Sequence, residues 1–189
     1  MITQLTTVKS RLAIDAFDVK YDDLLTNAIK AVGARFDKIC NRAFARTVSA
    51  THEFDPCEME LAPAGYPIES VTKFELKSNE VEGWVEQTGI DYVIRHRCVI
   101  ALRLPLSGAS PPALARVTYT GGYVLPGTTP GAGQTVLPDD LEQAASWFLN
   151  RDKLGLIRRW PKGGIYEQFI QTELLPGVTE VLKAYTRFG

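Results

Sequence analysis

The sequence predicts an α+β domain in which amphipathic helices, one of them long, pack on an antiparallel β-sheet. Helical periods flank a central series of short β-prone runs, and 189 residues with 45% apolar side chains are enough to bury a core. We predict a single domain over residues 1–189, with a helical N-terminal part at about 3–43, a β-rich part at about 47–122, a Gly/Pro/Thr loop at about 125–137 and a helical C-terminal part at about 138–189.

Residues 22–43 carry the longest helical period. Apolar residues recur there at alternating steps of four and three, at Leu25, Ile29, Val32, Phe36, Ile39 and Ala43. Leu24, Ala28 and Cys40 are predicted to widen this stripe. We therefore predict a long helix whose apolar face packs on a β layer. A coiled coil is the alternative that this alternation leaves open.

Three shorter helices are predicted from the same kind of pattern. Residues 3–12 have apolar residues at helical spacing and predict a short amphipathic helix. Pro138 opens a helix that runs to about residue 153, because proline is favoured at the first helical position. Residues 176–188 predict a last short helix.

The central region alternates apolar and polar residues over short runs that are separated by turns. We expect strands at about 47–54, 59–61, 68–77, 84–87, 92–95, 99–104 and 116–120. Short strands with frequent turns predict an antiparallel sheet and not βαβ units. Residues 125–135 are rich in Pro, Gly and Thr without any period, and they predict a mobile loop.

The charge and the cysteines exclude several classes of protein. A formal net charge of -1 supplies no overall field for binding nucleic acid or an anionic membrane. No run approaches the roughly 20 apolar residues of a membrane span, and the N-terminus lacks the charged and then apolar segments of a signal peptide. Cys40, Cys57 and Cys98 form no CxxC pair, so we expect reduced thiols and neither a disulfide framework nor a zinc knuckle.

Two groups of residues are candidates for chemistry. His52 with Asp55 and Cys57, or His96 with Cys98, would supply a nucleophile and base or metal ligands. His96 and Cys98, two apart on one predicted strand, would share a face. Neither group supplies the third positioning group of a catalyst or the about four ligands of a zinc site. We interpret both as strand-surface residues and predict no catalytic residue, no cofactor site and no metal site.

The segment TTPGAGQT, residues 128–135, is faintly similar to a phosphate-binding loop. Such a loop needs a lysine to reach the phosphates, but Gln134 stands at that place and Thr128 replaces the first glycine. The pattern therefore argues against nucleotide binding. The Asp pairs 22–23 and 139–140 stand at predicted helix starts, where the helix dipole already explains them.

Six features follow one another along nearly the whole chain. They are a short helix and the segments DDLLTNAIKAVGARFDKICNRAF, YPIESVTKFEL, ARVTYTGGY, LPDDLEQAASWFLNRD and LLPGVTEVLKAYTRF. In this order and spacing they resemble the head-to-tail connector (adaptor, head completion) proteins of tailed bacteriophages. The β region and the LPGTTPGAGQT insertion are longer than in the shortest members of that family, which leaves the roles of the loops open.

The resemblance implies a structural virion protein and not an enzyme. It implies a homo-oligomeric ring of about twelve copies, built from heterologous interfaces. The ring would dock beneath the portal protein after DNA packaging, with a tail or stopper/tail-terminator protein below it. Double-stranded DNA would pass through the channel without sequence-specific binding. The location would be the virion neck, after synthesis in the cytoplasm of the host bacterium, with no membrane and no cofactor. Another neck or tail-completion protein, or a small enzyme of unrecognised type, remain the alternatives.

Two groups of residues are predicted to contact partners. The C-terminal apolar residues would dock on another protein, unless they cap the subunit's own core; they are Val178, Leu182, Tyr185 and Phe188. A basic cluster would face DNA or an acidic partner, unless it is a solvated face; it comprises Arg151, Lys153, Arg158, Arg159 and Lys162. We also expect the loop 125–135 and the C-terminal segment to become ordered on assembly.

Overall fold

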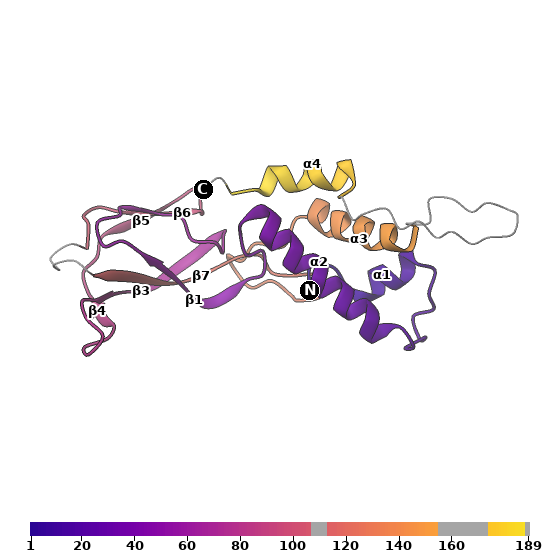
Figure 1. Cartoon of the computed structure of the whole chain (residues 1–189), viewed down its shortest axis with the longest axis horizontal. Coiled ribbons are helices and arrows are strands. Elements are labelled where there is room, and N and C mark those ends of the chain that lie inside the picture. The colour runs from indigo at the N-terminus through magenta and orange to yellow at the C-terminus, as the bar shows by residue number, and fades with distance from the viewer. Residues whose placement is uncertain (107–112, 155–173, 188–189) are drawn as a thin grey trace, which may run out of the picture. The chain divides into compact units, whose positions relative to one another are not determined.

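The computed structural model describes residues 1–106, 113–154 and 174–187, with residues 150–154 described by their backbone alone. Helices and antiparallel strands follow one another in the predicted order, which confirms the α+β class (Figure 1). The chain forms two compact units. The helical unit comprises Met1–Asn41, Leu125–Thr128 and Val136–Gly189, and the strand unit comprises Arg42–Val124 and Thr129–Thr135. The predicted domain thus consists of two compact units. The chain crosses from one unit to the other several times.

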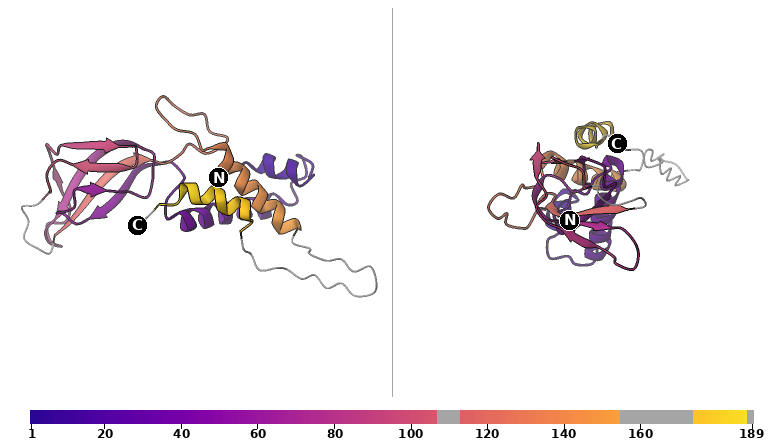
Figure 2. Two further views of the ribbon diagram at one scale, coloured as in Figure 1. Left: turned by 90° about the horizontal axis from the view of Figure 1, so that it is seen from above. Right: turned by 90° about the vertical axis from the view of Figure 1, so that its left-hand side faces the viewer.

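The helical unit contains α1 (Leu5–Arg11), α2 (Asp22–Cys40), α3 (Asp139–Leu154) and α4 (Pro176–Tyr185). The helix α2 packs against the other three helices, and α4 lies alongside α2 and α3 (Figure 2). The predicted face of α2 is confirmed for its first four positions, because Leu25, Ile29, Val32 and Phe36 are buried. No helix that the structure describes is long and apolar enough to cross a membrane.

The predicted end of α2 is wrong by three residues. Asn41 adopts the left-handed conformation with φ 49°, so α2 ends at Cys40 and Ala43 lies beyond it. Cys40, four residues after Phe36, continues the buried stripe, whereas Ile39 is exposed. Both steps keep a residue on the same side of a helix, so the packing of α2 against the other helices decides which of the two residues is covered.

Contacts far apart in sequence close the helical unit. The hydroxyls of Thr3 and Ser146 lie 3.3 Å apart in the core, so the N-terminal segment is held against α3. After α4, the backbone N–H of Arg187 donates to the carbonyl of Cys40 at 2.9 Å. Both ends of the described chain are therefore anchored on this unit.

The strand unit contains two antiparallel sheets, where the sequence predicted one. The first sheet has the order β1-β7-β3-β4 and the second the order β2-β6-β5. Their bounds are β1 (Thr47–Phe54), β2 (Glu60–Leu61), β3 (Ile68–Lys77), β4 (Val85–Gln87), β5 (Tyr92–Arg95), β6 (Val99–Leu102) and β7 (Leu114–Gly121). Buried residues from both sheets, among them Phe74 and Ile100, share one core. The strand unit thus has a core of its own.

The glycines of the ARVTYTGGY segment are required by close backbone contacts. A side chain at Gly121 would collide with the carbonyl oxygen of Gly65, and Gly122 has φ 103° with the carbonyl oxygen of Ala45 only 2.6 Å from the place of a Cβ. The Tyr119 hydroxyl accepts a hydrogen bond of 3.0 Å from the buried N–H of Gly65. This segment of β7 therefore fixes the chain around residue 65.

Candidate assembly surfaces

The predicted C-terminal contact residues do not form one exposed surface. Val178 and Leu182 are 0% and 1% exposed inside the helical unit, which corrects the prediction that a partner contacts them. They fall on the core side of the period of α4. The Tyr185 hydroxyl donates to Asp140 Oδ1 at 2.9 Å and links α4 to α3. Phe188 lies outside the described residues, and a partner contact by Tyr185 or Phe188 stays a prediction.

The predicted basic cluster lies largely outside the described part of the chain. Arg151 and Lys153 belong to the last turn of α3, where the backbone alone is described. Arg158, Arg159 and Lys162 lie outside the described residues. The role of this cluster stays a prediction.

The histidines and cysteines occupy unrelated positions. His52 is on β1, where its ring stacks on Phe54 with centroids 6.4 Å apart, and Cys57 is exposed in the following turn. The prediction that His96 lies on a strand beside Cys98 is wrong. His96 and Arg97 have φ 49° and 58°, the geometry of a type I′ turn between β5 and β6. Among the residues that the structure describes, no three His, Cys, Asp or Glu side chains gather as metal ligands would.

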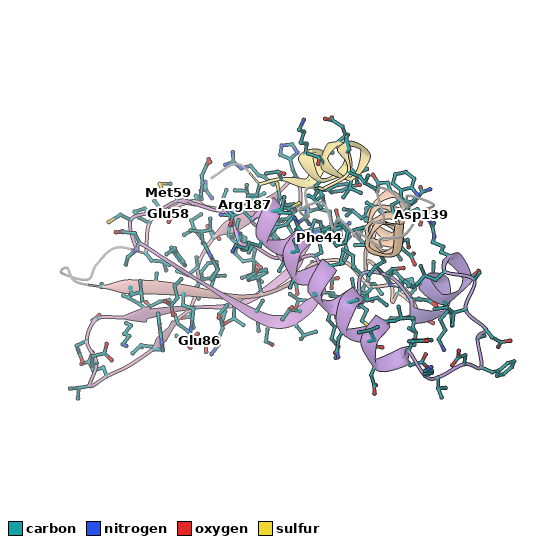
Figure 3. All side chains as sticks on the ribbon, turned by 45° about the vertical axis from the view of Figure 1, so that its right-hand side comes forward. Phe44, Glu58, Met59, Glu86, Asp139 and Arg187 are labelled. Carbon is teal, nitrogen blue, oxygen red and sulfur yellow. The ribbon has the colours of Figure 1, made fainter. Side chains whose placement is uncertain are left out.

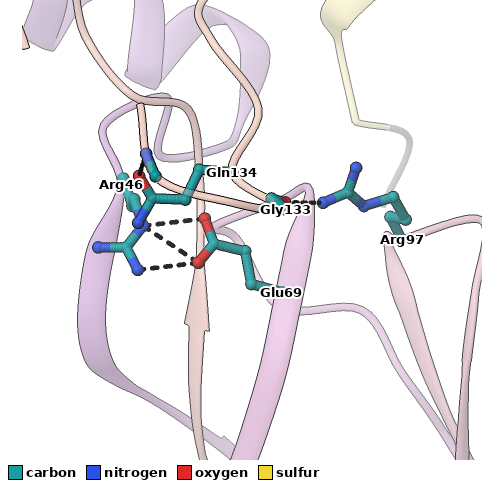
Figure 4. Close-up of polar contacts among 6 residues, drawn as sticks. Arg46, Glu69, Arg97, Gly133 and Gln134 are labelled. Atoms are coloured by element: carbon teal, nitrogen blue, oxygen red, sulfur yellow. Dashed lines mark hydrogen bonds and ion pairs between the residues drawn. The ribbon is translucent and has the colours of Figure 1, made fainter. Parts of the chain in front are cut away.

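The loop at 125–135 has hydrogen-bonded turns of its own. Gln134, at the place where a phosphate-binding loop has lysine, accepts the N–H of Gly131 on its Oε1 at 2.8 Å (Figure 4). Arg97 donates to the carbonyl of Gly133 at 3.0 Å. The Gln134 side chain therefore closes a turn of this loop. Ordering of the loop on assembly stays a prediction.

Ion pairs join charged side chains on the four-stranded sheet and at its edge. Arg46 forms a bidentate pair with Glu69 at 2.9 and 2.8 Å, and this hydrogen bonding raises the pKa of Arg46 (Figure 4). Glu75 is buried between Lys73 and Arg116, each at 2.8 Å. Burial raises the pKa of Glu75, but hydrogen bonds from Lys73 and Arg116 together outweigh it, so the pKa lies below its ordinary value. These pairs neutralise the charges of Glu69 and Glu75.

A hollow of about 660 Å³ lies on the three-stranded sheet of the strand unit. Its lining is mixed, since charged residues stand beside apolar ones: Met59, Glu60, Asp91, Tyr92, Val93, Arg95, Ala101, Leu102 and Arg103. Met59 stands at the surface of this unit (Figure 3). Arg95 pairs with Glu60, and Arg103 lies 3.8 Å from Asp91. The charges around this hollow are therefore already paired within the chain.

A groove of about 520 Å³ lies on the helical unit, and its lining is almost entirely apolar. Its lining comprises Leu12, Ile14, Tyr21, Leu24, Leu25, Ala28 and Leu149, in which the Tyr21 hydroxyl is the one polar side-chain group. Leu24 is 68% exposed, which corrects the prediction that it widens the buried stripe. The connection between α1 and α2 exposes Phe17 by 92% and Val19 by 72%. This connection was not among the predicted contact surfaces, although its apolar residues stand among aspartates in the sequence.

Comparisons with known proteins identify the fold. No family model matches the chain, and no curated protein matches its sequence. Three solved structures resemble it over nearly its whole length. The neck of an empty gene transfer agent (GTA) particle, computed with C6 symmetry, matches with a TM-score of 0.62 and 16% identity, over 100% of this chain and 91% of the other.

The other two structures come from native GTA particles. The neck computed with C12 symmetry has a TM-score of 0.55 and 19% identity, over 97% of this chain and 91% of the other. The virion has a TM-score of 0.56 and 19% identity, over 97% and 88%. The resemblance to head-to-tail connectors is thus confirmed at the level of the fold, and the chain has the fold of a component of these phage-like particles.

Proposed function

We propose that the protein is a structural subunit of the neck of a phage-like virion and that it has no enzymatic role. The observation that carries this proposal is the match of the whole chain to the neck of a GTA particle, at a TM-score of 0.62 and 100% coverage. The six sequence features that resemble phage connectors support it independently, because they rest on residues and not on the fold.

The subunit assembles as a ring of about twelve copies, the closed form that a heterologous interface makes when its rotation divides the full circle. The C6 and C12 symmetries of the two similar necks support this arrangement. The ring docks beneath the portal protein, meets a tail, stopper or tail-terminator protein below, and extends the DNA channel toward the tail. A net charge of -1 suits a channel wall along which DNA slides, since each phosphate contact would strengthen binding.

Removal of the gene from the producing virus or particle tests the proposed place in assembly. Electron microscopy should show heads with portals but without attached tails, and the wild-type protein supplied in trans should restore complete particles. Normal tailed particles in the absence of the protein would contradict the proposal. Co-purification with the portal, and not with the tail tube alone, separates a connector from a tail-completion protein.

The enzyme alternative is tested in the same assay. The substitutions His52→Ala, Cys57→Ser and His96→Ala should each restore tailed particles as well as the wild type, because an assembly subunit uses surface shape and not these side chains. Loss of particles with a folded His52→Ala or Cys57→Ser protein would favour a catalytic role.

A further inference from the structure

We propose that the four-stranded sheet continues from one copy of the chain into the next, with β1 of one copy paired antiparallel to β4 of a second copy. The inference rests on the proposed function, because it names two surfaces that would meet in the ring. The strands β1 and β4 are the outer strands of this sheet (Figure 1). An outer strand presents backbone N–H and C=O groups to which another strand can bond. Each copy therefore offers both halves of a heterologous contact.

The strand β1 lacks most of the features that protect the edge of a sheet. It has eight residues, TVSATHEF, without lysine or proline, and Phe54 is its one buried residue. The pairing with β7 is irregular between Thr47 and Ala50, where Ser49 has φ 58°, and it is regular from Ala50 to Phe54. A β-prone run of five residues therefore remains available at this edge.

The strand β4 is short and equally open. Val85 and Glu86 are exposed, and Gln87 is half-buried. Gln87 Nε2 donates to the carbonyl of Val85 at 3.2 Å, and this exposed bond can give way to a pairing strand. Three residue pairs cover little area, so the pairing would specify which surfaces meet, while the apolar surface of the helical unit would add binding free energy.

The directions of the strands select β4 as the partner of β1. Every neighbouring pair in this sheet is antiparallel, so the four strands alternate and β1 and β4 run opposite ways. Rotation about a ring axis preserves these directions, so β4 of the next copy meets β1 as an antiparallel neighbour. The sheet β2-β6-β5 has three strands, whose outer strands run the same way and would meet as the less common parallel pair. Pairing of β1 with β1 would be isologous and would close a dimer instead of a ring.

The backbone hydrogen bonds of the two edges also match. In an antiparallel sheet a residue exchanges both of its bonds with one neighbour, so bonded and non-bonded pairs alternate across a row of strands. In a row of four strands the two outer residues therefore both point to the free edge or both point inward. Such rows run through Gln87, Phe74, Val117 and His52 and through Val85, Leu76, Ala115 and Phe54. The two edges can thus bond with outer residues of these rows opposite each other and their side chains on one face.

The carboxylates of the two edges select the register. Glu86 of β4 and Glu53 of β1 end one row of the sheet, so they lie on the same face. Glu86 opposite Glu53 of the next copy would be destabilising, because like charges opposite each other repel. A shift of two residues in one direction brings another carboxylate, Asp55, opposite Glu86, and a shift in the other direction brings Thr51. The second shift keeps every side chain on its face and avoids the repulsion.

In this register Glu53 of one copy lies opposite Trp84 of the next. Trp84 directly precedes β4, and its ring lies beneath Arg116, whose Cζ is 4.2 Å from the ring centroid. Arg116 and Lys73 share one carboxylate, that of Glu75, so this site has more cations than carboxylates. The carboxylate of Glu53 would therefore approach a basic site. The charges of the two edges are complementary in this register, which supports a second copy as the occupant.

A chain with the substitutions Thr51→Cys and Glu86→Cys tests the contact. The background carries Cys57→Ser and Cys98→Ser, while Cys40 is buried. Within one chain the introduced thiols are at least three strand spacings, about 14 Å, apart, so a bismaleimide with a spacer of roughly 8 Å joins only different copies. After assembly on the portal, denaturing electrophoresis should show a ladder of linked chains up to the ring number.

Two controls accompany this measurement. Each single substitution should give no linked chains, because β1 does not meet β1 and β4 does not meet β4 in the proposed ring. Val93→Cys in place of Thr51→Cys should give no ladder, since Val93 is 64% exposed but lies on β5, an outer strand of the other sheet. Linked dimers from Thr51→Cys alone would show an isologous contact and overturn the proposal.

Charge substitutions test the register. Thr51→Glu should raise the concentration required for assembly by about two- to fivefold, because it sets a carboxylate opposite Glu86. Glu86→Lys in the same chain should restore assembly, since the pair then attracts. Thr47→Glu is the matched control and should leave assembly unchanged, because Thr47 is exposed on the same strand but lies before its regular part. Thermal melting shows that the variants fold. Assembly of Thr51→Glu at the wild-type concentration would overturn the register.

The outcomes separate this inference from the proposed function. A ladder from the double variant but not from the controls supports the contact. Rings that form on the portal without the ladder would overturn the contact and leave the neck function standing. A wild-type protein that forms no ring, with or without the portal, would contradict the proposed function, and the contact with it.

Discussion

The helical unit and the strand unit differ in what they leave unpaired at the surface. The groove of the helical unit is lined by apolar side chains apart from the Tyr21 hydroxyl, and Phe17 and Val19 of the α1–α2 connection and Leu24 of α2 are exposed within eight residues. The hollow of the strand unit is larger, but Arg95 pairs there with Glu60 and Arg103 lies near Asp91. The charges around the hollow of the strand unit are thus paired within the chain, whereas the groove of the helical unit is lined by apolar area that its core does not use.

This difference indicates which of the two surfaces a partner protein covers with the greater gain in free energy. Desolvating paired charges costs free energy that the new contact must offset, while covering apolar area is favourable from the start. We therefore expect the helical unit to contribute more to assembly and the strand unit to act as a stable support.

Phe36→Ala should have the largest effect on stability, because it empties a fully buried site in the C-terminal half of α2. We expect a loss of about 3–5 kcal/mol in the free energy of unfolding. Hydrogen exchange should show amides of α2 losing protection while amides of β7 keep it, because each unit has its own core. Equal loss of protection in both would show that the two units unfold as one, against the comparison drawn here.

Glu75→Gln should destabilise the strand unit by about 1.5–3 kcal/mol at neutral pH, because it removes charged hydrogen bonds to Lys73 and Arg116. The pKa of Glu75 is lowered in the folded state, so its contribution is fully present above the unfolded pKa of about 4.3. That contribution is lost as the pH falls through the lower, folded pKa. Urea unfolding from pH 7 to pH 3 should therefore be less pH-dependent in the variant. An unchanged pH dependence would refute the role of this pair.

Tyr119→Phe should cost about 1–3 kcal/mol, since it leaves the buried N–H of Gly65 without its acceptor. The ring itself stays, so any loss reports the hydroxyl. Tyr123→Phe is the control, because Tyr123 belongs to the same segment but is less buried. Urea unfolding measures both variants. A Tyr119→Phe protein as stable as the wild type would show that the hydroxyl does not fix the chain around residue 65.

Leu24→Ser and Leu25→Ser form the sharpest matched pair, because adjacent residues of one helix differ in exposure. Leu24 is 68% exposed, so its substitution should change the free energy of unfolding by less than about 0.5 kcal/mol. Leu25 is buried, and its substitution should cost at least about 2 kcal/mol. Leu24→Ser should nevertheless impair assembly on the portal. If Leu24→Ser assembles normally, the exposed apolar surface of α2 has no part in the interface.

The helical periods of the sequence predicted the features that depend on local backbone geometry. The spacing of Leu25, Ile29, Val32 and Phe36 specified the buried face of α2, and Pro138 indicated the start of α3. The same periods could not show that Leu24 is exposed, because exposure depends on which neighbouring elements cover a helix. Nor could they show that Val178 and Leu182 are used by the subunit's own core.

The candidate surfaces were harder to predict than the fold. Phe17 belongs to no helical or strand period, so the sequence carried no sign that it is exposed. Its position follows from the hydrogen-bonded turns of the connection between α1 and α2. The turn at His96 and Arg97 requires positive φ at residues that seldom adopt it, and the sequence therefore favoured a strand residue. The pairing of Glu75 with Arg116 joins β3 to β7 across a long separation in sequence, which no local pattern records.

The mass of the purified protein in solution, measured with and without the portal of the same particle, tests the neck proposal most directly. We predict that the protein binds the portal and forms there a ring of about twelve copies, a closed assembly of heterologous contacts. A protein that keeps one small mass at all concentrations and ignores both portal and tail would contradict the proposal.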